Sequence, residues 1–245
     1  MCGRYAQTLG AEEIVQSFNL DGSTLDHSLP LNWNIAPTNE IYIIRNSADA
    51  NQATARILDS ASWGMIAPWH KNLAQARASQ SHAINARSES IHEKPTFRNA
   101  FRTSRCLIPA TGYYEWATSL GKYPPKQPFY ITRVDHRPLS IAGIWSSWVS
   151  DNGQVIQSAA IITREAVGDL ATIHSRMPVF MPEDRWSEWL NLQSRDIHHL
   201  ISLMENADPA AGVMAVPVSP RVNQVAHNGP DLVTPIELGA PETLF

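Results

Sequence analysis

Extended segments dominate the middle of this sequence, and helical patterns lie toward its two ends. Runs of strand-forming residues cover 41–45, 54–58, 106–108, 129–134, 139–148 and 155–163. The last two runs flank the turn sequence DNG at 151–153, which is typical of a hairpin. Helical spacing predicts helices over Ala11–Phe18, after Pro182 and over Asp196–Met204. We therefore expect an α+β fold, built on a curved, barrel-like antiparallel β-sheet with peripheral helices.

The 245 residues show no internal repeat and no low-complexity linker. A single domain over residues 1–245, with a C-terminal extension from about 225 to 245, is the simplest organisation. No stretch approaches the roughly 20 apolar residues that span a bilayer, and the start of the chain does not resemble a secretion signal. We expect a monomer in the cytoplasm, associated with the nucleoid and without membrane contact.

The cysteine content restricts the possible chemistry. The chain has two cysteines, Cys2 and Cys106, which are too few for a disulfide framework or a cysteine-based zinc site. Among the scattered histidines, His198 and His199 are too close together to share a tetrahedral metal site. We expect no metal and no cofactor. Because there are only two cysteines, any cysteine chemistry in this chain should use a single thiol.

The formal net charge of −4 argues against binding nucleic acid through bulk electrostatics. Basic residues nevertheless gather between Lys71 and Arg105, where seven bases and two acids leave a local excess of five. From charge alone, a chance cluster on a solvated surface explains such a patch more readily than a binding function does.

The second residue has unusual chemical potential. Cys2 follows Met1, and a small second residue is the type after which the initiator methionine is normally removed. Removal would expose an amine and a thiol on adjacent carbons, both usable near neutral pH. Such a group reacts with an aldehyde to give a Schiff base, and the thiol then closes a thiazolidine ring.

Seven motifs, in order along the chain, accompany Cys2. They are MCGR at 1–4, WNIAPT at 33–38, WGMIAPW at 63–69, NARSES at 85–90, RCLIPA with GYYEW at 105–116, AGIW at 142–145 and IHSRMP at 173–178. Together they resemble the SOS response-associated peptidase (SRAP) family, and the resemblance covers nearly the whole chain. It implies the SRAP fold and a protein that senses abasic sites in single-stranded DNA, removes its own Met1 and crosslinks covalently to the lesion through Cys2.

The resemblance also assigns the site residues. The nucleophile falls on Cys2, the positioning amide on Asn85, the carboxylate on Glu115 and the imidazole on His174. Glu115 lies in an aromatic run, where partial burial would raise its pKa toward neutrality and suit it to proton transfer. His174 could protonate the sugar ring oxygen as the deoxyribose opens to its aldehyde. Taken singly, each of these residues has an ordinary structural explanation.

DNA binding calls for guanidinium groups on phosphates and aromatic faces against bases. The candidates within or beside the motifs are Arg4, Arg87, Arg98, Arg176, Trp69 and Trp116. Other tryptophans, including Trp63, Trp145, Trp186 and Trp189, are expected in the core.

Two alternatives stay open at this point. Cys2 could serve an N-terminal-nucleophile cysteine hydrolase or peptidase, with its own amine as the base. The chain could also be a non-enzymatic single-strand binder in which Cys2 is incidental. The three hypotheses differ in the electrophile that Cys2 attacks. It is an aldehyde for the crosslinker and an amide or peptide carbonyl for the hydrolase, and the binder has none.

Overall fold

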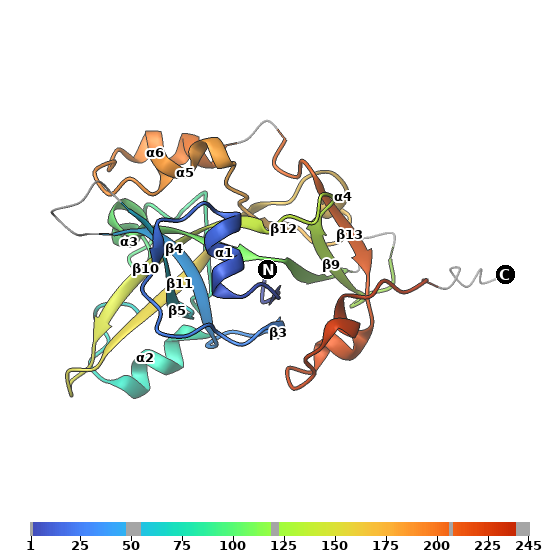
Figure 1. Cartoon of the computed structure of the whole chain (residues 1–245), viewed down its shortest axis with the longest axis horizontal. Helices are drawn as coiled ribbons and strands as arrows, with labels where there is room; N and C mark the ends of the chain where they lie inside the picture. Colours follow the sequence, from blue (N-terminus) through green and yellow to red (C-terminus); the bar gives the residue numbers. More distant parts are fainter. Residues whose placement is uncertain (1, 48–54, 119–122, 206–207, 239–245) are drawn as a thin grey trace.

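The computed structural model describes residues 2–47, 55–118, 123–205 and 208–238. Within these ranges no helix is long and apolar enough to cross a membrane. Two β-sheets form the centre of the molecule, and short helices lie around them (Figure 1).

The first sheet has five strands in the order β13-β9-β8-β1-β3, and every pairing is antiparallel. Its strands are β1 (Arg4–Gln7), β3 (Asn32–Ile35), β8 (Gly112–Trp116), β9 (Pro128–Arg133) and β13 (Val213–Pro217). Strand β1 lies between β8 and the edge strand β3, so the start of the chain is paired on both sides and does not form an edge of the sheet.

The second sheet closes on itself. Strand β11 pairs with β10 on one side and with β5 on the other, so β11, β10, β7, β4 and β5 form a ring. The bounds of this sheet are β2 (Gly22–Ser23), β4 (Glu40–Asn46), β5 (Arg56–Trp63), β6 (Asn85–Arg87), β7 (Arg105–Ala110), β10 (Leu139–Val149), β11 (Val155–Glu165) and β12 (Arg176–Pro178). This closure confirms the α+β, barrel-like prediction.

The barrel departs from a purely antiparallel sheet at three pairings. Strand β11 pairs in parallel with β5 and with β6, and β2 pairs in parallel with β5. These partners are far apart in sequence, so periodicity within a single strand carries no information about them. The run expected over 54–58 begins at Arg56, and residue 54 lies outside the described residues.

The helices are peripheral, as predicted. They are α1 (Ala11–Ser17), α2 (Leu73–Gln80), α3 (Arg98–Thr103), α4 (Gly168–Ala171), α5 (Trp186–Trp189) and α6 (Ile197–Met204). In Figure 1, α5 and α6 lie together on one side of the barrel and α2 lies on the opposite side. Helix α6 begins at Ile197 because the Asp196 side chain accepts a hydrogen bond from the amide of His199 at 2.7 Å.

The segment after Pro182 divides into two short helices. A 3₁₀ turn, η1 (Glu183–Arg185), precedes α5 and leads the chain so that Trp186 and Trp189 enter the core. Two further 3₁₀ turns, η2 (Pro220–Asn223) and η3 (Pro230–Val233), follow β13.

Apolar side chains form two main cores. One lies beneath α1, α3, α5 and α6 and includes Trp186 and Trp189. The other fills the space around β1 and the barrel and includes Cys2 and Trp63. The core prediction is therefore confirmed for these three tryptophans, whereas Trp145 is only partly buried beneath the Arg45 guanidinium.

Arg105 corrects the surface-patch interpretation. Its side chain is fully buried, and its guanidinium donates to main-chain oxygens on two segments, including Trp189 at 2.7 Å and Phe101 at 2.9 Å. Burial lowers the pKa of Arg105 to about 10. This arginine joins β7 to α3 and α5 and contributes nothing to a surface for DNA.

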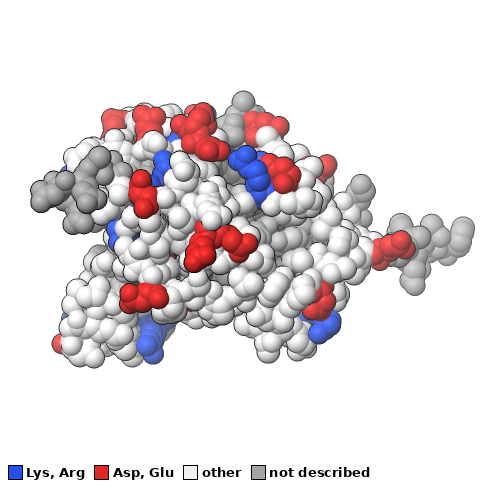
Figure 2. All heavy atoms as spheres, in the orientation of Figure 1, with Lys and Arg blue, Asp and Glu red and all other residues white. Residues whose placement is uncertain are grey.

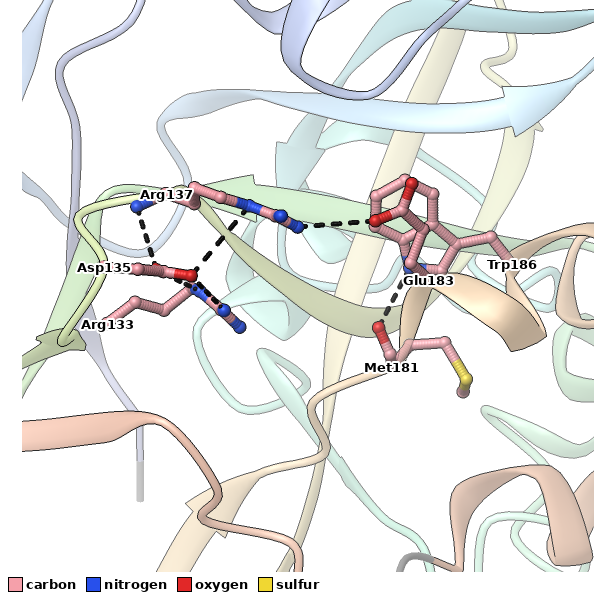
Figure 3. Close-up of polar contacts among 6 residues, drawn as sticks. All are labelled: Arg133, Asp135, Arg137, Met181, Glu183 and Trp186. Carbon is pink, nitrogen blue, oxygen red and sulfur yellow. Dashed lines mark hydrogen bonds and ion pairs between the residues drawn. The ribbon is translucent and has the colours of Figure 1, made fainter.

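Charged side chains on the face of the molecule drawn in Figure 2 are mainly acidic. Figure 2 shows Asp and Glu side chains spread over this face, with the Lys and Arg side chains in separate small groups. Some arginines of the chain are already paired, as in Figure 3, where Asp135 contacts Arg133 at 2.7 Å and Arg137 contacts Glu183 at 3.3 Å. The described atoms of this face offer no continuous basic track for a phosphate backbone.

Candidate active site around Cys2

Cys2 lies two residues before Arg4, the first residue of β1, and is fully buried. Strand β1 is fixed on both sides by pairing, with Arg4 opposite Tyr114 and Tyr5 opposite Ile35. The thiol accepts a hydrogen bond from the Arg4 amide, but burial dominates and raises the pKa of Cys2, and the nearby Glu115 carboxylate raises it further. The sulfur is therefore a protonated thiol until something in the site stabilises its anion.

Asn85 reaches Cys2 from a distant part of the sequence. It is the first residue of β6, which is placed by parallel pairing with β11, where Asn85 is opposite Ile161. The Asn85 side-chain nitrogen donates to the main-chain oxygen of Cys2 at 2.8 Å. Its side-chain oxygen is buried and has no hydrogen-bond partner among the described residues. One end of this amide thus holds the Cys2 backbone while the other remains available as an acceptor.

Glu115 lies on β8, which pairs with β1, the strand that follows Cys2. The residue is 4% exposed, and burial raises the pKa of its carboxyl group to about 7. This agrees with the expectation from its aromatic surroundings. A carboxyl group with this pKa can both donate and accept a proton at neutral pH.

His174 follows α4 and is half-buried beside Glu115. Its Nδ1 is 3.9 Å from the Glu115 carboxylate and accepts a hydrogen bond from the Arg176 amide at 3.0 Å. Burial is the main cause that lowers the pKa of His174. Because Nδ1 is used as an acceptor, the neutral ring carries its proton on Nε2. From Nε2 the ring can donate this proton to a bound group.

The structure thus brings together the four residues predicted for the catalytic site. They come from separate segments: the chain start, β6, β8 and the loop before β12. The arrangement combines a buried thiol, an amide, a carboxyl group near neutrality and an imidazole.

The predicted phosphate contacts divide into two groups. Arg87 and Arg98 are exposed. Arg4 instead serves the fold, because its guanidinium donates to the Asn34 side chain at 2.8 Å and to the Val222 oxygen at 2.9 Å. A phosphate could use Arg4 only by sharing or displacing these partners.

Arg176 is also paired. Its guanidinium forms a two-point ion pair with the Glu89 carboxylate, at 2.6 and 3.0 Å. Hydrogen bonding from Arg176 lowers the pKa of Glu89. The sequence interpretation missed Glu89, although this residue lies in the same motif as Asn85. An acid within an arginine-containing motif is the signal that could have identified it.

The two tryptophans proposed for base stacking are in different settings. Trp69 is 53% exposed on the segment before α2. Trp116 is half-buried, donates from its ring nitrogen to the Asn223 side chain at 2.7 Å and has the Arg4 guanidinium 6.0 Å from its ring centre. Trp69 therefore has the freer ring face for a ligand.

A large surface hollow lies apart from these residues. It has a volume of about 710 Å³ and its lining includes Glu40, Arg77 and Gln157, but none of the four predicted catalytic residues. Volume alone therefore does not locate the chemistry of this protein. Among the described residues, no group of three or more His, Cys, Asp and Glu side chains could hold a metal ion.

The fold and the site define an α+β protein with a buried N-terminal thiol beside an amide, a carboxyl group and an imidazole. A family model described as "SOS response associated peptidase (SRAP)" matches residues 1–225, and the chain belongs to this family.

Curated relatives and solved structures agree with that assignment. The chain is 32% identical over 233 residues to the abasic site processing protein YoqW of Bacillus subtilis. The aligned region covers 95% of this chain and 99% of the relative. It is 28% identical to the abasic site processing protein HMCES of Gallus gallus, over 81% of this chain and 62% of that one.

Two crystal structures share the fold. A protein from Bacteroides thetaiotaomicron has a TM-score of 0.82 at 23% identity, over 96% of this chain and 100% of that one. A protein from Bordetella bronchiseptica has a TM-score of 0.72 at 28% identity, over 89% of this chain and 100% of that one.

Proposed function

We propose that this protein processes abasic sites in single-stranded DNA and forms a covalent thiazolidine crosslink through Cys2. The observation that carries the proposal is the convergence of Asn85 and the Glu115–His174 pair on a buried Cys2. The names of the curated relatives supply the substrate class. Met1, whose removal would free the Cys2 amine, lies outside the described residues.

The reaction begins at the sugar. His174, with its proton on Nε2, donates that proton to the ring oxygen as the bond between this oxygen and C1 breaks. The C1 hydroxyl loses its proton to Glu115, which leaves the aldehyde, and Glu115 returns the proton to His174. The free Cys2 amine attacks the aldehyde carbon, and loss of one water gives an imine. The Asn85 side-chain oxygen accepts a hydrogen bond from the amine and orients it, while Glu115 transfers the protons of the carbinolamine step.

Ring closure completes the crosslink. The Cys2 sulfur adds to the imine carbon, the S–H bond breaks, and the proton passes to the imine nitrogen. The ring holds the lesion carbon between two atoms of one residue. Its formation within a single residue is favoured because both reacting groups are already in place.

The DNA contacts in this proposal come from exposed groups near the motifs. Arg87 and Arg98 bind phosphates, and Trp69 stacks against a base beside the lesion. Arg176 joins them when a phosphate replaces Glu89 on its guanidinium. Arg4 and Trp116 support this DNA-binding surface through their hydrogen bonds to the Val222 oxygen and the Asn223 side chain.

The test uses trimmed protein, verified by the loss of one methionine in intact-mass analysis. It is incubated with a single-stranded oligonucleotide carrying one abasic site and run on a denaturing gel. We expect a shifted band that is absent in Cys2→Ala and retained in Cys106→Ala, because both thiols are buried but only Cys2 is beside Asn85. Equal crosslinking by Cys2→Ala and the wild type would overturn the proposal.

A peptidase that acts beyond Met1 is the competing function, because the family description names a peptidase. Repeated cleavage of added peptides by the trimmed protein, together with a blank crosslinking gel, would establish the peptidase instead.

A further inference from the structure

Two tyrosine hydroxyl groups in the core around Cys2 have no hydrogen-bond partner in the described part of the chain. They belong to Tyr5 on β1 and Tyr113 on β8, both of which are fully buried. The two residues are directly opposite each other in the antiparallel β1–β8 pair, so their side chains lie on the same face of the sheet. Buried hydroxyls are normally paired, and an unpaired one is costly. Two such hydroxyls together indicate that a hydrogen-bond partner for them arises at this site.

Their position connects them to the Cys2 chemistry. Tyr113 is two residues before Glu115 on the same strand, and alternate residues of a strand share a face. Tyr5 and Tyr113 also pack in the same buried cluster as Cys2. Sequence reasoning missed both, although the alternation of Tyr113 and Glu115 in the GYYEW motif could have identified one of them.

The ionisation of these groups is consistent with a donor role. Burial raises the pKa of both phenols well above its ordinary value, and the Cys2 thiol raises it further. Glu115 adds to the effect on the pKa of Tyr113. Both hydroxyls therefore keep their protons at neutral pH and can donate a hydrogen bond to an anion.

We propose that Tyr5 and Tyr113 donate hydrogen bonds to the Cys2 sulfur as it closes the thiazolidine ring. In that step the S–C bond forms, the S–H bond breaks and the proton passes to the imine nitrogen, while both phenols keep their protons. Hydrogen bonds to an ionised acceptor are about twice as strong as neutral ones, so they act when the sulfur carries negative charge. The proposal rests on the proposed reaction of Cys2 with an aldehyde.

The experiment compares trimmed wild type with Tyr5→Phe, Tyr113→Phe and the double variant. Tyr42→Phe is the matched control, because Tyr42 is equally buried but its hydroxyl contacts Leu29 in the other core. Acetaldehyde replaces DNA as the electrophile. Intact mass reports the product, one aldehyde added and one water lost, and borohydride traps the open imine separately from the closed ring.

We expect ring closure to slow about tenfold in Tyr113→Phe and further in the double variant, with more imine trapped at early times. Tyr42→Phe should close the ring at the wild-type rate. The melting temperature of Tyr113→Phe should be unchanged or higher, because the substitution removes a buried hydroxyl without a partner. That of Tyr42→Phe should fall.

Three results would overturn the proposal. The first is wild-type ring closure in the double variant. The second is a parallel loss of imine formation, ring closure and stability, which indicates a structural role. The third is failure of the wild type to form any ring. If acetaldehyde closes a tyrosine-dependent ring but abasic DNA is not crosslinked, the DNA function fails and the tyrosine role stands.

Discussion

The side-chain nitrogen of Asn85 donates a hydrogen bond to the main-chain oxygen of Cys2 at 2.8 Å. This contact joins the start of the chain to a strand 83 residues away and holds the backbone of the reactive residue. Because the hydrogen bond is to the backbone, it does not consume the amine or thiol of Cys2. Asn85 can therefore orient Cys2 throughout the reaction.

Replacing Asn85 with Ala should slow crosslinking by about 10- to 100-fold, since small displacements of a reacting group have effects of this size. Stability should fall by about 1 kcal/mol through the lost hydrogen bond. Single-turnover gels and thermal unfolding measure the two effects. Asp196→Ala is the control, because it removes the cap of α6 at a similar cost in stability. Equal crosslinking rates in the two variants would show that the Asn85 contact has no role in orientation.

Glu115 should make stability depend on pH. Its pKa is about 7 in the fold and 4.5 in the reference state, so the folded protein binds the proton more tightly. The contribution of Glu115 to the free energy of unfolding is therefore most favourable below pH 4.5. About 3 kcal/mol of it is lost as the pH rises toward 7. Glu115→Gln should lack this loss, and urea unfolding between pH 4 and 8 measures the difference. The exposed Glu93→Gln variant should retain the wild-type profile.

The ion pair of Glu89 with Arg176 should compete with DNA. Replacing Glu89 with Gln removes the charged partner of Arg176 and leaves the guanidinium only its contacts with Thr163, so single-stranded DNA should bind more tightly at low salt. The slope of log affinity against log salt should steepen by about 1. Fluorescence anisotropy with a Cys2→Ala background separates binding from crosslinking. Glu183→Gln likewise removes one acidic partner of an arginine, Arg137, which keeps its contact with Asp135, and should leave DNA affinity unchanged. An unchanged slope in Glu89→Gln would remove Arg176 from the DNA path.

Trp69 should act on DNA without supporting the fold. Because its side chain is 53% exposed, Trp69→Ala should lose about 1–3 kcal/mol of affinity for single-stranded DNA and little stability. The fully buried Trp189→Ala should instead lose about 3–5 kcal/mol of stability. Anisotropy and thermal unfolding distinguish the two. Unchanged DNA affinity in Trp69→Ala would leave the exposed ring without its proposed role.

Local patterns were enough to predict several elements. The runs that became β4, β9, β10 and β11 show the alternation and β-branched residues of strands, and Asp196 marks the start of α6. Shorter strands escaped prediction. Strand β6 has three residues and exists only because it pairs with β11. Its existence depends on a long-range partner that no local pattern contains.

The sequence by itself determined the residue types available for chemistry: a thiol at position 2, an amide, a carboxyl group and an imidazole in ordered motifs. Only the tertiary structure decided which groups meet and in which state. It buried Arg105, paired Arg176 with Glu89 and enclosed Tyr5 and Tyr113 near Cys2. The physical reason is that pairing between distant strands sets distance and burial. Those two quantities govern pKa values and hydrogen bonds.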